Sequence, residues 1–161
     1  MSDVIQWINE KIIDEGNKIA ANDIDEVRDF VLLWNLFEDL LCNNNANMNK
    51  IDNLIDRFID ILDENKYQEI YEYFHNRYKD DGTKFKALKL RRPHKNLVKK
   101  ILDDEFVDKN NKLKFIMAII YRYRNNLFHG EKDMKKIKFQ KENFEQTNKF
   151  LMYFIETCKD N

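Results

Sequence analysis

The sequence predicts an all-α protein, and three observations carry that prediction. Apolar residues recur at helical spacing along nearly the whole chain, and no segment alternates between apolar and polar residues over a convincing length. Only 3 Gly and 1 Pro occur among 161 residues, too few for the many turns of a sheet protein. Hydrophobic residues make up 43% of the chain, which is typical of a globular protein. We expect one domain over residues 1–161, a bundle of about five to seven helices.

Two helices are expected at the start of the chain. Isoleucines spaced along residues 4–21 define the apolar face of the first. Asp23, with Glu26 three residues later, has the arrangement of a capping box and is expected to open the second. The apolar stripe of that helix continues to Leu41.

Two further helices are expected after a loop. The asparagine-rich segment 43–47 interrupts the apolar pattern and predicts that loop. Helices over residues 51–62 and 66–79 follow it, and Gly82 is expected to end the second of these in the left-handed conformation.

The second half of the chain begins with a basic stretch, residues 84–100, which carries eight Lys and Arg and no acidic residue. Apolar residues within it and just after it predict short amphipathic helices, and Pro93 interrupts them: Leu88, Leu90, Leu97, Ile101 and Leu102. Two strongly apolar helices are expected after this stretch, one from about residue 111 and one over residues 144–158.

The two halves of the chain differ in charge. Residues 1–80 hold 8 Lys and Arg against 18 Asp and Glu, whereas residues 81–161 hold 20 against 11. Two interpretations fit this asymmetry. The basic half provides a face that binds a polyanion, or the acidic and basic helices attract each other within one fold.

Several classes of function are excluded by absent motifs. Gly16, Gly82 and Gly130 stand alone, so the chain has neither a GxGxxG nor a Walker phosphate loop. Cys42 and Cys158 form no CxxC pair, which fits a reducing compartment. The N-terminus lacks the apolar core of a signal peptide, and no apolar run is long enough to span a membrane. We therefore expect a cytoplasmic protein without membrane contact.

A metal centre is not expected either. Glu72 and His75 have the ExxH spacing of di-iron carboxylate bundles, but such a bundle needs two of these motifs. Neither His94 nor His129 has an acidic residue three positions before it. The sequence therefore predicts no metal site and no cofactor.

The segment 121–130 ends an apolar helix with an unusual group of polar side chains. Four of them fall near one face of a regular helix: Arg122, Asn125, Asn126 and His129. Arg124 lies at the edge of the apolar stripe, where a cation needs a partner or an aqueous cleft. A purely structural interpretation stays open here, in which His129 interacts with the negative end of the helix dipole and Arg124 pairs with a carboxylate.

Arg124, Asn125 and His129 form the pattern R-N-x-x-x-H, which resembles the R-x(4–6)-H signature of the HEPN superfamily. These are small all-α domains, many of them metal-independent endoribonucleases of toxin–antitoxin and antiviral (phage-defence) systems. The asparagine directly after the arginine and the position at the end of a late apolar helix sharpen the resemblance. The segment 34–38, which ends in Glu38, resembles the helix that places a polar or acidic residue near the motif.

The resemblance implies a role for each residue of the motif. His129 and Arg124 would be the catalytic pair, Asn125 a polar helper, and Glu38 would orient the arginine or form a salt bridge with it. Imidazole can carry out the proton transfers of RNA cleavage, and a guanidinium matches phosphate oxygens two at a time. The products would carry 2′,3′-cyclic phosphate and 5′-OH ends. The expected RNA contacts are Arg122, Asn126, Arg91, Arg92 and Lys95.

The spacing of the motif raises a geometric question. Five residues separate Arg124 and His129, which is about 140° around a straight helix. Either the helix ends or distorts near Phe128, or the site forms between two motifs. HEPN proteins often pair motifs across a dimer, so the resemblance implies a homodimer, and a cognate antitoxin or regulatory protein as a further partner.

We therefore predict a metal-independent endoribonuclease of a bacterial toxin or phage-defence system. The main alternative is a non-catalytic HEPN-like module that binds protein, nucleotide or RNA. A third hypothesis is an unrelated helical adaptor in which the motif is coincidental.

Overall fold

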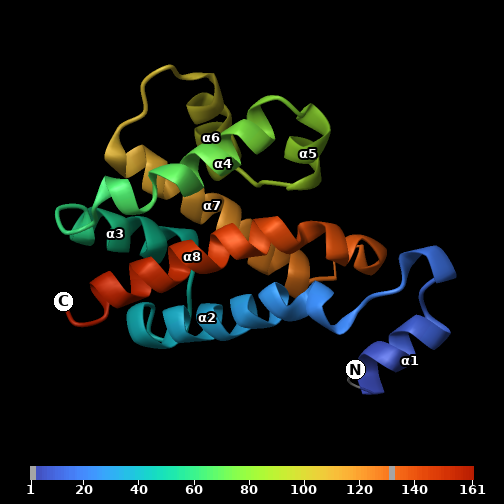
Figure 1. Cartoon of the computed structure of the whole chain (residues 1–161). Helices are drawn as coiled ribbons and strands as arrows, with labels where there is room; N and C mark the ends of the chain where they lie inside the picture. The colour runs from blue at the N-terminus through green and yellow to red at the C-terminus, as the bar shows by residue number, and fades with distance from the viewer. Residues whose placement is uncertain (1–2, 131–132) are drawn as a thin grey trace.

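The structure is a computed structural model that describes residues 3–130 and 133–161 (Figure 1). Within these residues the chain is helical and contains no strand, which confirms the all-α prediction. The described residues hold eight α-helices, more than the five to seven expected, and two of them are the short helices of the basic stretch. The helices are α1 (Asp3–Lys11), α2 (Asp25–Leu41), α3 (Met48–Phe58), α4 (Gln68–Lys79), α5 (Gly82–Ala87), α6 (His94–Asp103), α7 (Lys109–Phe128) and α8 (Lys141–Cys158).

Helices α7 and α8 lie at the centre of the bundle, and α2 packs along α8. α2 and α8 lie side by side and run in the same direction, with α7 antiparallel to both (Figure 1). Phe30 lies 5.2 Å from Phe144 near the beginning of the pair, and Phe37 lies 6.1 Å from Phe154 further along, measured between ring centres. Residues 115–120 of α7 are all buried, because the other helices surround this segment.

The prediction of a first helix over residues 4–21 is wrong in its length. α1 ends at Lys11, and the chain turns back through a 3₁₀ segment, Glu15–Asn17. The amide of Asn9 explains the turn, because it bonds both backbone groups of Ile19: its nitrogen donates to the carbonyl at 2.7 Å and its oxygen accepts from the N–H at 2.8 Å. Ile5, Ile13 and Ile19 thereby pack into a small separate cluster with Ile137 instead of forming one helical face.

Two expected capping roles also differ. Asp23 accepts from the backbone N–H of Ala20 at 2.8 Å and so stabilises a 3₁₀ segment, while α2 begins at Asp25. Gly82 is the first residue of α5 and not the left-handed end of α4. Asp81 accounts for this, because its carboxylate accepts from the backbone N–H groups of Thr83 and Lys84 in the first turn of α5.

The remaining helices follow the sequence pattern within a few residues. The loop at 43–47 is confirmed, and Asn47 caps α3, which begins and ends earlier than expected. The basic stretch forms two short helices, α5 and α6, as predicted. α7 ends at Phe128, which agrees with the expectation that the helix ends or distorts near this residue. Gly130 follows with φ 66°.

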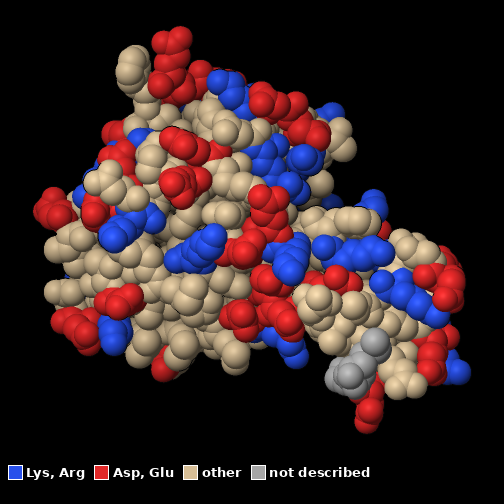
Figure 2. Space-filling view, in the orientation of Figure 1, with Lys and Arg blue, Asp and Glu red and all other residues tan. Residues whose placement is uncertain are grey.

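Acidic residues of the first half pair with basic residues of the second half in some regions of the fold and hardly at all in the basic stretch. Contacts between acidic and basic residues distant in sequence join the acidic half to the basic half: Asp14–Lys135, Glu26–Lys141, Glu38–Arg124, Asp52–His94, Asp56–Lys114 and Glu64–Lys112. Figure 2 shows the resulting mixture of both signs on one face. In the basic stretch, however, Lys84 is the one Lys or Arg with a carboxylate within 4.0 Å among the described residues. These contacts join the two halves of the chain, and the Lys and Arg residues of the basic stretch take little part in them.

Candidate active site

The first part of the candidate site is the ion pair between Glu38 of α2 and Arg124 of α7. Arg124 Nη2 lies 3.8 Å from Glu38 Oε1, and the two side chains are 30% and 18% exposed. The indole N–H of Trp34, one turn earlier on α2, donates to the same carboxylate oxygen. Because Trp34 is buried in the core, it holds Glu38 in place. The structure thus brings together the two residues that the sequence paired.

The guanidinium of Arg124 is held from two further directions. Its Nη1 donates to Asn125 Oδ1 at 3.0 Å, and its central carbon lies 5.2 Å from the centre of the Phe128 ring. Its Nε is buried and has no hydrogen-bond partner within the described part of the chain. A cation fixed by a carboxylate, an amide and an aromatic ring is oriented before any ligand binds.

His129 lies at the end of the same helix. It is the residue that follows the last helical residue of α7, and its backbone N–H donates to the carbonyl of Asn125 at 2.9 Å. His129 is exposed. Five residues correspond to about 7.5 Å along a helix axis, so Arg124 and His129 lie about one and a half turns apart on the same end of α7.

Arg122 and Asn126, expected to contact RNA, form an internal anchor. Arg122 Nε donates to the carbonyl of Leu88 at 2.8 Å, and Asn126 Nδ2 donates to the same oxygen at 3.2 Å. The two residues are only 6% and 3% exposed. Asn126 therefore helps to position the backbone between α5 and α6, and its contact with RNA stays a prediction.

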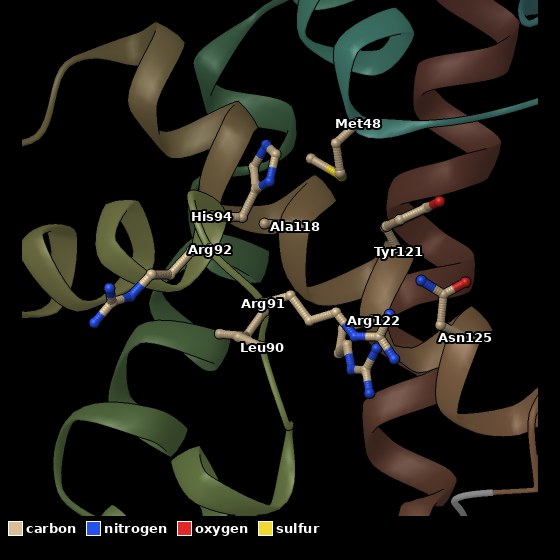
Figure 3. Close-up of a pocket in the computed structure, with 9 residues that line it drawn as sticks. All are labelled: Met48, Leu90, Arg91, Arg92, His94, Ala118, Tyr121, Arg122 and Asn125. Atoms are coloured by element: carbon tan, nitrogen blue, oxygen red, sulfur yellow. The ribbon is translucent and has the colours of Figure 1, made fainter.

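This anchor places the arginines of the basic stretch beside α7. A cavity of ≈ 80 Å³ lies there (Figure 3). Its polar lining comes from the segment between α5 and α6, from the start of α6 and from α7: Arg91, Arg92, His94, Arg122 and Asn125. In Figure 3, Arg91 extends toward Arg122, whereas the end of Arg92 points away from the cavity. Met48, Leu90, Ala118 and Tyr121 form the rest of the wall.

Of the polar side chains that line this cavity as named above, His94 is the one that was not predicted to be a site residue from the sequence. Its Nε2 lies 3.4 Å from Asp52 Oδ2, which connects the start of α6 to α3. In the sequence, the adjacent Arg91 and Arg92 indicate a site in this segment. A cavity forms there only because the segment is anchored to α7 at Leu88. Lys95, the third expected contact of the basic stretch, is exposed and does not line the cavity.

No family model, curated protein or solved structure matches the chain. Among the described residues, no three His, Cys, Asp or Glu side chains are grouped closely enough to hold a metal ion. No helix in the described ranges is long and apolar enough to cross a bilayer. The features that bear on function are therefore the geometry around Arg124 and the neighbouring cavity.

Proposed function

We propose that the protein is a metal-independent endoribonuclease of the HEPN type, acting as a toxin or in phage defence. The observation that carries the proposal is the guanidinium of Arg124, fixed by Glu38, Asn125 and Phe128 on the same helix end as the exposed His129. An oriented arginine and an accessible imidazole are the two groups that metal-free cleavage of RNA needs.

In the proposed mechanism His129 moves protons and Arg124 stabilises charge. The imidazole of His129 accepts the proton of the ribose 2′-OH, and the resulting oxygen attacks the adjacent phosphorus. Arg124 binds the non-bridging oxygens of the phosphorane, where negative charge accumulates. Protonation of the 5′-oxygen by an imidazolium breaks the P–O5′ bond and leaves a 2′,3′-cyclic phosphate and a 5′-OH end.

We propose that the enzyme works as a homodimer, because Arg124 and His129 lie about 140° apart around one helix, whereas the reaction needs both groups at one phosphate. Arg124 of one subunit and His129 of the other, facing a common groove, would then form each site. Exposed apolar side chains near the motif support this assembly. Phe128 is 52% exposed at the end of α7, and Leu32, Leu36 and Leu40 form an exposed stripe along α2.

The alternative function is a non-catalytic module that binds protein, nucleotide or RNA. The observation that favours it is the same ion pair. Glu38 and Asn125 already contact Arg124, so the arginine can be explained as a structural link between α2 and α7. The two proposals differ in what removal of the His129 imidazole does, because that side chain is exposed and has no part in the link.

The deciding experiment incubates purified protein with total RNA in the presence of EDTA. Wild type should cleave RNA and leave 2′,3′-cyclic phosphate ends. His129→Ala should lose cleavage by roughly 10²–10⁴-fold, the usual contribution of general acid–base catalysis, with an unchanged helical circular dichroism spectrum. His75→Gln, on α4 outside the site, is the matched control and should cleave normally. Cleavage that EDTA abolishes, or that His129→Ala retains, contradicts the proposal.

A further inference from the structure

The cavity beside α7 is lined by arginines from α7 and from the segment between α5 and α6. Among the described residues, Arg91 and Arg92 have no carboxylate within 4.0 Å, and no acidic side chain lines the cavity. Asp52 of α3 contacts His94 at the edge of this segment. Arg122 contributes a guanidinium that is almost fully buried, where a charge acts on an anion more strongly than in water.

Asn125 connects this cavity to the proposed catalytic arginine. Its side-chain oxygen accepts from Arg124, and its nitrogen lies on the cavity side of the amide in Figure 3. The amide therefore offers N–H donors to a ligand in the cavity while its other end holds Arg124. Arg124 and Asn125 are consecutive residues, so the two positions for an anion are adjacent.

The size of the cavity limits what it can hold. A volume of ≈ 80 Å³ suits a single phosphate group better than a nucleoside. Guanidinium groups and an amide are the donors that bind phosphate oxygens with defined geometry. The position next to Arg124 favours a phosphate on the strand that Arg124 itself binds.

We infer that Arg91, His94, Arg122 and Asn125 form a subsite for an internal phosphodiester of RNA, next to the phosphate that is cleaved. This inference rests on the proposal that RNA is the substrate. The subsite fixes the register of the strand, so that the scissile phosphate comes to lie at Arg124.

The test measures binding of a fluorescent 2′-O-methyl oligoribonucleotide that has no terminal phosphate and no 2′-OH, so that cleavage cannot interfere. Its affinity is measured as a function of NaCl concentration. Arg91→Gln should bind roughly fivefold more weakly at 0.1 M salt, and the slope of log K against log[salt] should fall by about 0.7, the value for one lost contact to a single strand. Arg91→Lys, which keeps the charge, should restore most of the slope.

Lys66→Gln is the matched control, because it removes one exposed positive charge from the 3₁₀ segment Glu64–Lys66, outside the cavity. It should leave the slope unchanged. Equal slopes for Arg91→Gln and wild type, or a wild type that does not bind the oligonucleotide, overturn the subsite.

Two further results separate the subsite from related explanations. If a 5′-phosphate on the oligonucleotide raises the affinity of wild type but not of Arg91→Gln, the cavity holds a terminal phosphate, and the assignment to an internal phosphodiester is wrong. If wild type cleaves RNA and Arg91→Gln keeps its salt dependence, the subsite fails and the ribonuclease stands. If the slopes differ as expected but no RNA is cleaved, the subsite stands and the ribonuclease fails.

Discussion

Glu38 of α2 receives a hydrogen bond from Trp34 and lies 3.8 Å from Arg124 of α7. The carboxylate is thus tied to the buried core on one side and to the candidate catalytic arginine on the other. Arg124 cannot change its direction without separating from this carboxylate or moving α2. The ion pair therefore makes α2 a positioning element for the site.

Glu38→Gln should reduce RNA cleavage by roughly tenfold, which corresponds to about 1.4 kcal/mol of lost transition-state stabilisation. The amide keeps an oxygen for the Trp34 indole but loses the charge that orients Arg124. Single-turnover cleavage measures the effect, and Glu38→Asp, which keeps the charge, should recover part of the rate. Asp39→Asn removes the neighbouring exposed carboxylate and should cleave like wild type. If Glu38→Gln and Asp39→Asn cleave equally well, Glu38 does not position Arg124.

A mixture of Arg124→Ala and His129→Ala proteins should regain part of the activity that each has lost. In a homodimer whose sites combine residues of both subunits, half of the randomly formed dimers are heterodimers, and each keeps one intact site. Cleavage by the mixture is compared with cleavage by each variant alone. A mixture that remains inactive after verified subunit exchange shows that the site does not combine residues in this way. If the protein is a monomer in solution and still cleaves RNA, the proposal of a homodimer is wrong.

Asn126→Ala should lower the free energy of unfolding by about 1–2 kcal/mol, because the carbonyl of Leu88 loses one of its two side-chain donors in a buried setting. Urea denaturation measures this loss. The exposed Asn96 on α6 provides the control, and Asn96→Ala should change stability by less than about 0.5 kcal/mol. Equal stability of the two variants would mean that Arg122 alone holds Leu88.

The stability of the fold should decrease above about pH 9 through its two buried thiols. Burial raises the pKa of Cys42 to about 11, with a smaller contribution from the charge of Glu38, and burial raises the pKa of Cys158 to about 12. The unfolded chain therefore loses these protons at lower pH than the folded chain. Because the unfolded state then binds fewer protons, the free energy of unfolding falls as pH rises, and the stabilisation is complete only below the ordinary pKa of a cysteine.

Cys158→Ser measures this dependence. Above pH 9 and below pH 11, the variant should lose stability less steeply than wild type by up to about 1.4 kcal/mol per pH unit, the contribution of one titrating group. Chemical denaturation at a series of pH values gives the slope, independently of any constant loss from the substitution. Identical slopes for variant and wild type would show that the thiol of Cys158 ionises equally in both states.

Features set by neighbouring residues in sequence were predictable. Apolar periodicity gave the helical class and the position of α7. Pro93 separated the helices of the basic stretch, and Gly130 marked the end of the motif helix with its positive φ. These features depend on interactions within one or two helical turns, which a single sequence displays directly.

The sequence by itself determined that the chain is helical and that Arg124, Asn125 and His129 lie together at the end of one helix. Only the tertiary structure decided that Asn9 folds the first helix back onto Ile19, and that Leu88 is anchored to α7 so that the cavity forms beside Arg122. The physical reason is the same in both cases. A side chain bonds a backbone group far away in the chain, and such a bond leaves no periodic pattern in the sequence because it depends on the packing of whole helices.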